Sequence, residues 1–148
     1  MKKEYLAVAG ALALCASAGT ACAQGSGAQK RENVLYYIMY MVDFKPGTED
    51  EAWEIIYDHF VPVDNAVDRK VIAFDPQSGG WDQIVYFPIG ETTDDLEWSR
   101  SAVEAAWWSK LVEQEGGEKK AEAMMERFNN LVAREERHIV HLHTDAAE

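Results

Sequence analysis

The sequence contains few cysteines and none of the common catalytic signatures. Its only cysteines are Cys15 and Cys22, which both precede residue 24. A mature domain that starts at residue 24 forms no disulfide bond and binds no structural zinc through cysteine. The sequence also has no glycine-rich phosphate loop, no nucleophile elbow and no His-Glu-x-x-His motif, which argues against the enzyme classes that depend on them.

Basic residues are scarce as well. The chain has 14 lysines and arginines against 26 aspartates and glutamates, for a formal net charge of −12 at pH 7. Such a charge repels phosphate backbones and anionic lipid head groups. We therefore expect no nucleic-acid partner and no docking on a membrane surface.

Residues 1–23 have the three-part form of a cleavable secretion signal. Lys2 and Lys3 precede an apolar run over residues 6–18 that is too short to span a bilayer. The small-x-small sequence of residues 21–23 then fits a signal-peptidase site. We predict cleavage after Ala23 and a periplasmic or secreted location.

Cys22 leaves one alternative to a soluble mature chain, which is a lipid anchor on that cysteine after cleavage at Ala21. Against it, Gly19 stands where the lipoprotein signal usually has leucine. In either case we expect a flexible leader over residues 24–33, one domain over residues 34–144 and a short tail over residues 145–148.

The first predicted strand, residues 34–44, is apolar on both faces. Aromatic and β-branched side chains dominate it, and a Lys-Pro-Gly turn follows. A half-exposed strand alternates between apolar and polar residues, so this strand must be covered on both sides. Its two faces are Tyr36, Ile38, Tyr40, Val42 and Phe44 on one side, and Leu35, Tyr37, Met39 and Met41 on the other.

Two helical regions and three further strands follow. Thr48 and Glu51 have capping-box spacing and predict a helix that ends near Phe60, before Pro62. Thr93 is the predicted N-cap of a second helix, which Gly116 and Gly117 separate from a third. The remaining strands are predicted at residues 69–75, 81–89 and 134–144.

This order, β-α-β-β-α(α)-β, predicts the ferredoxin-like α+β fold. Its four-stranded antiparallel sheet has the first and third strands at the centre, and these are the two that are apolar on both faces. The helices cover one sheet face only. A row of large apolar side chains rarely stays exposed on a monomer, so we expect a homodimer that packs sheet against sheet.

With these elements in place, the chain resembles the dimeric α+β barrel superfamily, which includes antibiotic-biosynthesis-type monooxygenases and NIPSNAP-like proteins. The resemblance lies in the order of elements, in the aromatic start of strand 34–44, in the Pro-Gly turn and in the hairpin that ends with residues 81–88. It includes no diagnostic motif, and the segment around Gly116 and Gly117 lengthens the usual plan. The resemblance therefore implies a fold and no catalytic residue.

Aromatic residues are the first candidates for a ligand pocket. Clusters of Tyr and Trp often line an apolar pocket with a few polar groups, although a core or dimer interface explains most such residues. Trp107 and Trp108 cannot both face one core on a helix, so one of them contacts a partner, a loop or a ligand. The pocket candidates are Trp53, Trp81, Tyr86, Trp107 and Trp108.

The histidines are the second group of candidates. His59 is a candidate catalytic base together with Tyr36 and Tyr40, although a histidine near a helix C-terminus is also explained by the helix dipole. His141 and His143 point to the same side of the last strand and could bind a metal if a third ligand approached. We favour ordinary polar residues at an edge strand and expect no metal and no cofactor.

Three functions remain open from the sequence. The first is an exported protein that binds a small apolar or aromatic molecule, without an assigned activity. The second is a cofactor-independent enzyme of the monooxygenase or isomerase type, and the third is a metal- or haem-binding protein that uses the C-terminal histidines.

Overall fold

The computed structural model describes residue 27 and residues 29–144. The predicted signal segment, both cysteines and the tail lie outside the described residues. All helices and strands below belong to one unit that begins at Glu32. No helix in the described part of the chain is long and apolar enough to cross a membrane.

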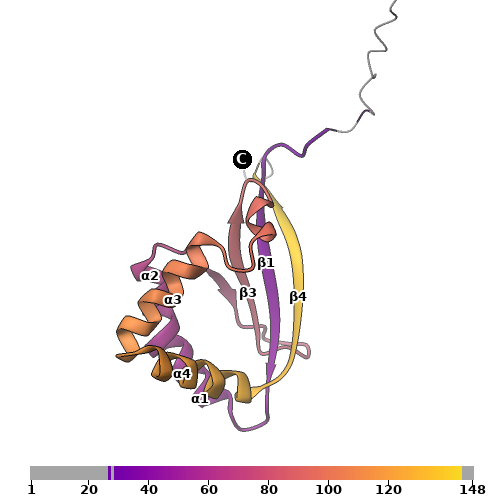
Figure 1. Cartoon of the computed structure of the whole chain (residues 1–148). Coiled ribbons are helices and arrows are strands. Elements are labelled where there is room, and N and C mark those ends of the chain that lie inside the picture. The colour runs from indigo at the N-terminus through magenta and orange to yellow at the C-terminus, as the bar shows by residue number, and fades with distance from the viewer. Residues whose placement is uncertain (1–26, 28, 145–148) are drawn as a thin grey trace, which may run out of the picture. The chain divides into compact units, whose positions relative to one another are not determined.

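The sheet has four antiparallel strands in the order β2-β3-β1-β4. β1 spans Val34–Phe44 and pairs with β3, Gln83–Gly90, on one side and with β4, Val132–His143, on the other. β2 is an edge strand of three residues, Ile72–Phe74, and is shorter than predicted. The predicted fold class is confirmed, with the first and third strands central and the second and fourth at the edges (Figure 1).

The helices cover one face of this sheet (Figure 1). The first helical region is continuous and consists of α1, a π-helical turn η1 and α2. A short 3₁₀ helix, η2, follows β3 and precedes two antiparallel helices, α3 and α4, whose contact is made through Leu111 and Ala121. The bounds are α1 Glu49–Ile55, η1 Ile56–Phe60, α2 Val61–Ala66, η2 Asp94–Glu97, α3 Ala102–Glu115 and α4 Glu118–Leu131.

The predicted end of the first helix before Pro62 is wrong. The chain stays helical through Pro62 to Ala66 because the π-helical turn widens the helix just before the proline. The N–H of Val61 donates to the carbonyl of Ile56, five residues back. Pro62 then lies in the first turn of α2, where a missing N–H costs little.

Thr48 is the N-cap residue of α1, as predicted, but the capping box predicted there is not formed and lies elsewhere. Thr48 makes no side-chain cap, since its hydroxyl donates to the carbonyl of Lys45 at 2.8 Å. Thr93 precedes only the 3₁₀ helix η2 and caps nothing. The capping box is formed at the start of α3, where the Ser101 N–H donates to Glu104 Oε2 at 2.8 Å and the Glu104 N–H donates to Ser101 Oγ at 3.2 Å.

The buried core lies at one end of the sheet. Val42 and Phe44, at the end of β1, pack against Ala52 and Ile55 of α1 and against Leu131 of α4. A second cluster joins the helices to one another, with Val63, Leu111 and Ala121 fully buried. The helical layer is therefore fastened to the sheet at one end.

The other face of the sheet has no helix over it (Figure 1). The register places Leu35, Tyr37, Met39 and Met41 on that face, because the alternate side chains of β1 point toward the helices. Their neighbours there are also large and apolar, with Phe74 57% and Leu142 52% exposed. We call this surface the outer face; its other apolar members are Ile72, Ile84, Tyr86 and Val140.

The capping box predicts a specific stability difference between two hydroxyl residues. Ser101→Ala removes the cap of α3 and is expected to lower the free energy of unfolding by about 1 kcal/mol. Thr93→Ala removes a hydroxyl that caps no helix and is expected to change it by less than about 0.5 kcal/mol. Urea unfolding of both variants measures the two free energies. Equal losses in Ser101→Ala and Thr93→Ala would contradict a specific contribution of the capping box.

Candidate functional site

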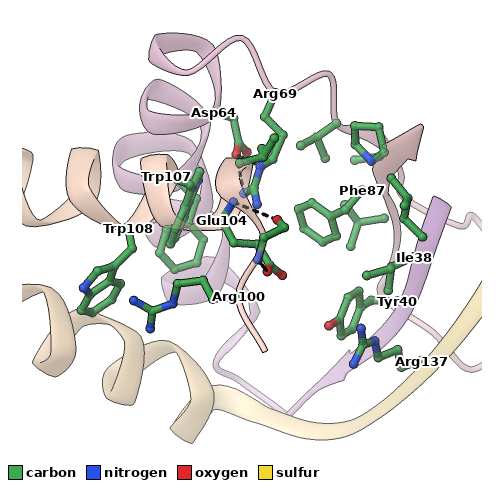
Figure 2. A pocket seen from close by; sticks show the side chains of 18 of the residues that line it. Ile38, Tyr40, Asp64, Arg69, Phe87, Arg100, Glu104, Trp107, Trp108 and Arg137 are labelled. Carbon is green, nitrogen blue, oxygen red and sulfur yellow. Dashed lines mark hydrogen bonds and ion pairs between the residues drawn. The ribbon is translucent and has the colours of Figure 1, made fainter. Parts of the chain in front are cut away.

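A cavity of about 880 Å³ lies between the sheet and the helices (Figure 2). Its sheet wall is formed by side chains of the central strands that point toward the helices. These are Ile38 and Tyr40 of β1 and their partners Phe87 and Val85 of β3. The cavity begins where the core ends, because Val42 belongs both to its lining and to the core cluster of the sheet.

The helix wall of the cavity is mainly aromatic. Phe60 of η1 contacts Trp107 of α3 edge to face, with ring centroids 5.7 Å apart, and Phe128 of α4 at 5.0 Å. Trp108 also lines the cavity, beside Trp107. Offset and edge-to-face contacts of this kind hold the rings in fixed positions, so the wall is a rigid apolar surface.

A partly buried ion pair crosses one part of the cavity. Asp64 of α2, which is only 9% exposed, accepts from Arg69 at 2.6 Å from Nε and 2.5 Å from a terminal nitrogen. The Arg69 guanidinium lies between two rings, 4.7 Å from the centroid of Phe87 and 4.9 Å from that of Trp107 (Figure 2). Arg69 therefore joins the sheet wall to the helix wall through charge and cation–π contacts.

Burial sets the protonation equilibrium of Asp64. Loss of solvent raises the pKa of this carboxyl above its ordinary value, and the charge and hydrogen bond of Arg69 oppose that rise without cancelling it. The indole N–H of Trp107 lies near enough to lower the pKa a little, but it makes no hydrogen bond of standard geometry with any described residue. Removal of Arg69 would leave Asp64 as an unpaired buried acid.

Tyr40 is the polar residue at the centre of the sheet wall. Burial is the main cause that raises the pKa of its phenol, and the nearby Arg137 opposes this rise while Glu135 and Glu104 add to it. Tyr40 therefore stays protonated at neutral pH and can donate a hydrogen bond. Arg137 of β4 lies 5.8 Å from the Tyr40 ring centroid (Figure 2).

The aromatic residues predicted for the pocket, together with the catalytic candidates Tyr36 and Tyr40, divide into two groups. Tyr40, Trp107 and Trp108 line the cavity together. The others lie elsewhere: Trp53 packs on Phe44 in the core, Trp81 lies under Arg134, Tyr86 contacts Tyr37 on the outer face, and Tyr36 contacts His141.

His59 does not line the cavity. Its Nδ1 lies 2.7 Å from Glu115 Oε1 at the end of α3, where Gln114 also donates to the His59 carbonyl. Burial acts to raise the pKa of Glu115, but hydrogen bonds from His59 and Gln114 outweigh it and the pKa is lowered. The contact joins η1 to α3, and the hypothesis that His59 is a catalytic base gains no support from this position.

His141 and His143 lie side by side, with ring centroids 4.8 Å apart. Tyr36 contacts His141 at 5.9 Å. Among the described residues, no group of three histidines, cysteines or carboxylates could bind one metal ion. The metal- or haem-binding hypothesis therefore has two candidate ligands and no third.

Sequence reasoning missed the polar residues of the cavity. Asp64 lies on α2, beyond the point where Pro62 is expected to end the helix, and Arg69 lies in the connection to β2, where the sequence predicts a strand from residue 69. Phe87 was assigned only to a strand face, and Arg137 only to an edge strand. No local motif marks these residues, since the cavity lining comes from helices and strands that are far apart in the sequence.

No known protein-family model matches the chain, and no curated protein matches its sequence. Solved structures match its fold. A NIPSNAP family protein of unknown function from Agrobacterium tumefaciens has a TM-score of 0.52 at 12% identity, over 78% of this chain and 95% of that chain. An uncharacterized NIPSNAP-like domain protein from Burkholderia xenovorans has a TM-score of 0.47 at 16% identity, over 74% and 85%.

A second NIPSNAP family protein from Agrobacterium tumefaciens has a TM-score of 0.49 at 15% identity, over 72% of this chain and 90% of that chain. At these identities the likeness concerns the fold alone. The chain therefore has the fold of NIPSNAP family proteins, which confirms the predicted resemblance at that level. A fold by itself assigns no activity.

The Asp64–Arg69 pair predicts a pH-dependent stability defect. Arg69→Met leaves Asp64 unpaired and is expected to lower the free energy of unfolding at pH 7 by about 2–4 kcal/mol. The defect should shrink as the pH falls, because the raised pKa of Asp64 makes the neutral acid the favoured buried form. Urea unfolding at several pH values measures it.

The matched control for this experiment is the double variant Asp64→Leu, Arg69→Met. It replaces the whole pair with apolar side chains and is expected to recover much of the stability at pH 7 and to lose the extra pH dependence. A defect in Arg69→Met that is the same at all pH values would contradict the role of Asp64.

Proposed function

We propose that the chain is an exported protein that binds one small apolar or aromatic molecule per protomer in the cavity between sheet and helices. The observation that carries this proposal is the cavity itself. Its volume of about 880 Å³ falls within the range of about 300–1,000 Å³ that is usual for small-molecule sites. Its walls are mainly aliphatic and aromatic, with a few polar groups at fixed positions, as such sites require.

Binding accounts for the cavity better than catalysis does. Among the described residues, the lining contains no histidine, cysteine or lysine and no nucleophile with its own base. The enzyme hypothesis relied on His59, which instead pairs with Glu115. We therefore place the cofactor-independent enzyme second.

We also propose that two copies associate through the outer face. This face carries large apolar side chains on all four strands, with no helix of the described chain over it. Polar groups lie toward its margin, where Arg134 pairs with Asp43 and His138 pairs with Glu136. An apolar centre with a polar rim is the usual composition of an interface between copies.

Export is the third component of the proposal. It rests on the secretion signal predicted in residues 1–23 and on cleavage after Ala23, with lipidation at Cys22 as the alternative. Mass spectrometry of the protein expressed in a bacterial host distinguishes the two. An N-terminus at Gln24 supports a soluble chain, and a lipidated Cys22 supports an anchored one.

The binding proposal is tested with an uncharged fluorescent probe, N-phenyl-1-naphthylamine. We expect one probe bound per protomer of residues 24–148. Phe87→Ala removes a ring from the sheet wall and should weaken binding by about tenfold. Tyr57→Ala, which removes an exposed ring outside the cavity, should leave binding unchanged. Failure of the probe to bind, or equal losses in both variants, would contradict the cavity as the binding site.

The dimer proposal is tested by light scattering of residues 24–148 over a dilution series. We expect twice the chain mass for the natural sequence. Met39→Glu places a charge in the centre of the outer face and should give a monomer with an unchanged circular dichroism spectrum. Tyr57→Glu adds the same charge at an exposed position on η1 and should remain dimeric. A monomer at all concentrations of the natural protein would rule out this association.

A further inference from the structure

Arginine is concentrated in the cavity of a chain that is otherwise strongly acidic. The sequence has six arginines, and three of them line the cavity: Arg69, Arg100 and Arg137. No lysine in the described part of the chain lines it. A need to balance surface charge does not explain why arginine and not lysine lines the cavity, because lysine carries the same charge. The planar guanidinium differs from lysine in that it matches oxyanions with two parallel hydrogen bonds.

The three arginines differ in what they already bind. Arg69 is neutralised by Asp64 and held between two aromatic rings. Arg100 and Arg137 make no ion pair and no hydrogen bond with any side chain of the described residues, and each lies beside an aromatic ring. Arg100 lies 5.7 Å from the centroid of Trp108, and Arg137 lies 5.8 Å from that of Tyr40. Their hydrogen-bond donors thus remain available.

These two arginines belong to opposite walls of the cavity. Figure 2 shows Arg100 on the helix side, beside Trp108, and Arg137 on the sheet side, beside Tyr40. The protonated hydroxyl of Tyr40 adds a third donor at the same part of the sheet wall. The apolar surface of Ile38 and Phe87 continues from Tyr40 along the same wall.

Carboxylates in the lining limit this positive charge. Glu104 is occupied by the capping box with Ser101. Asp95 and Glu135 also line the cavity, and Glu135 lies on β4 two residues before Arg137. The cavity therefore cannot attract anions from a distance, which the net charge of −12 also opposes. An anion would be bound by direct contact with the two guanidinium groups.

We infer that the cavity recognises an organic acid with an apolar or aromatic body and one anionic oxygen head group, which Arg100 and Arg137 bind from opposite walls. The body lies against Ile38, Phe87 and the ring of Trp107. This inference rests on the proposed function and specifies its ligand class. A purely apolar pocket would bind an uncharged molecule more tightly than its anionic counterpart. This site is expected to bind the anionic molecule more tightly.

Two fluorescent probes that differ by one anionic group test the inference. 1-Anilinonaphthalene-8-sulfonate carries a sulfonate, and N-phenyl-1-naphthylamine has the same ring system without it. We expect the natural protein to bind the sulfonate at least about tenfold more tightly. Arg137→Gln and Arg100→Gln should each reduce sulfonate affinity by about five- to tenfold and change affinity for the uncharged probe by less than about twofold.

The control is Lys119→Gln, which removes one positive charge from α4 outside the cavity and should leave both affinities unchanged. Circular dichroism verifies that each variant is folded. If the uncharged probe binds but the sulfonate is not preferred, or if the arginine variants affect both probes equally, the inference is overturned while the proposed function stands. If neither probe binds, both are overturned.

Discussion

The two apolar faces of β1 impose the constraint on which the rest of the structure depends. A strand at the centre of a sheet has each face in contact with a different neighbour, and the single helical layer can cover only one. The helices are attached to that face at one end, where Phe44 packs against Trp53 and Phe128. The remaining length of β1 borders the cavity on the helix side, and no described residue of the chain covers it on the outer face.

Arg69 connects the helical layer to the sheet at a second place, outside the buried core. Its guanidinium contacts Phe87 of β3 and Trp107 of α3 at once, and Asp64 of α2 neutralises it. The long arginine side chain reaches both walls, and the open part of the cavity lies beside it.

The fold was predictable from the sequence because it depends on pattern. The apolar faces of β1 and β3 and the order of the elements were sufficient to assign the central and edge strands correctly. The caps and the end of the first helix were not predictable, because Thr48, Thr93 and Pro62 each fit a local rule that the tertiary structure overrides. Propensity and capping rules describe an isolated helix, and here a π-helical turn decides the outcome.

The candidate site was predictable only in part, for a related reason. Trp107 and Trp108 were selected on the argument that adjacent tryptophans on a helix face different surroundings, but both line the cavity and pack against the same helix cluster. Trp81 and Tyr86 could not be rejected, since an aromatic residue on a strand has the same local pattern whichever face it occupies. The cavity arginines carry no signal in the sequence at all, because their role depends on which partners the fold leaves them.

The protonation states and hydrogen bonds of three polar groups in the cavity support the proposed ligand binding more than they support catalysis. General acid–base catalysis needs a group that exchanges protons near neutral pH within reach of the substrate. Asp64 is held by Arg69, Glu104 is held by the cap of α3, and burial keeps Tyr40 protonated. None of these three groups is free to exchange a proton with a ligand, which supports the proposed binding role. A reaction would have to use Asp95 or Glu135, the lining carboxylates that have no side-chain partner among the described residues.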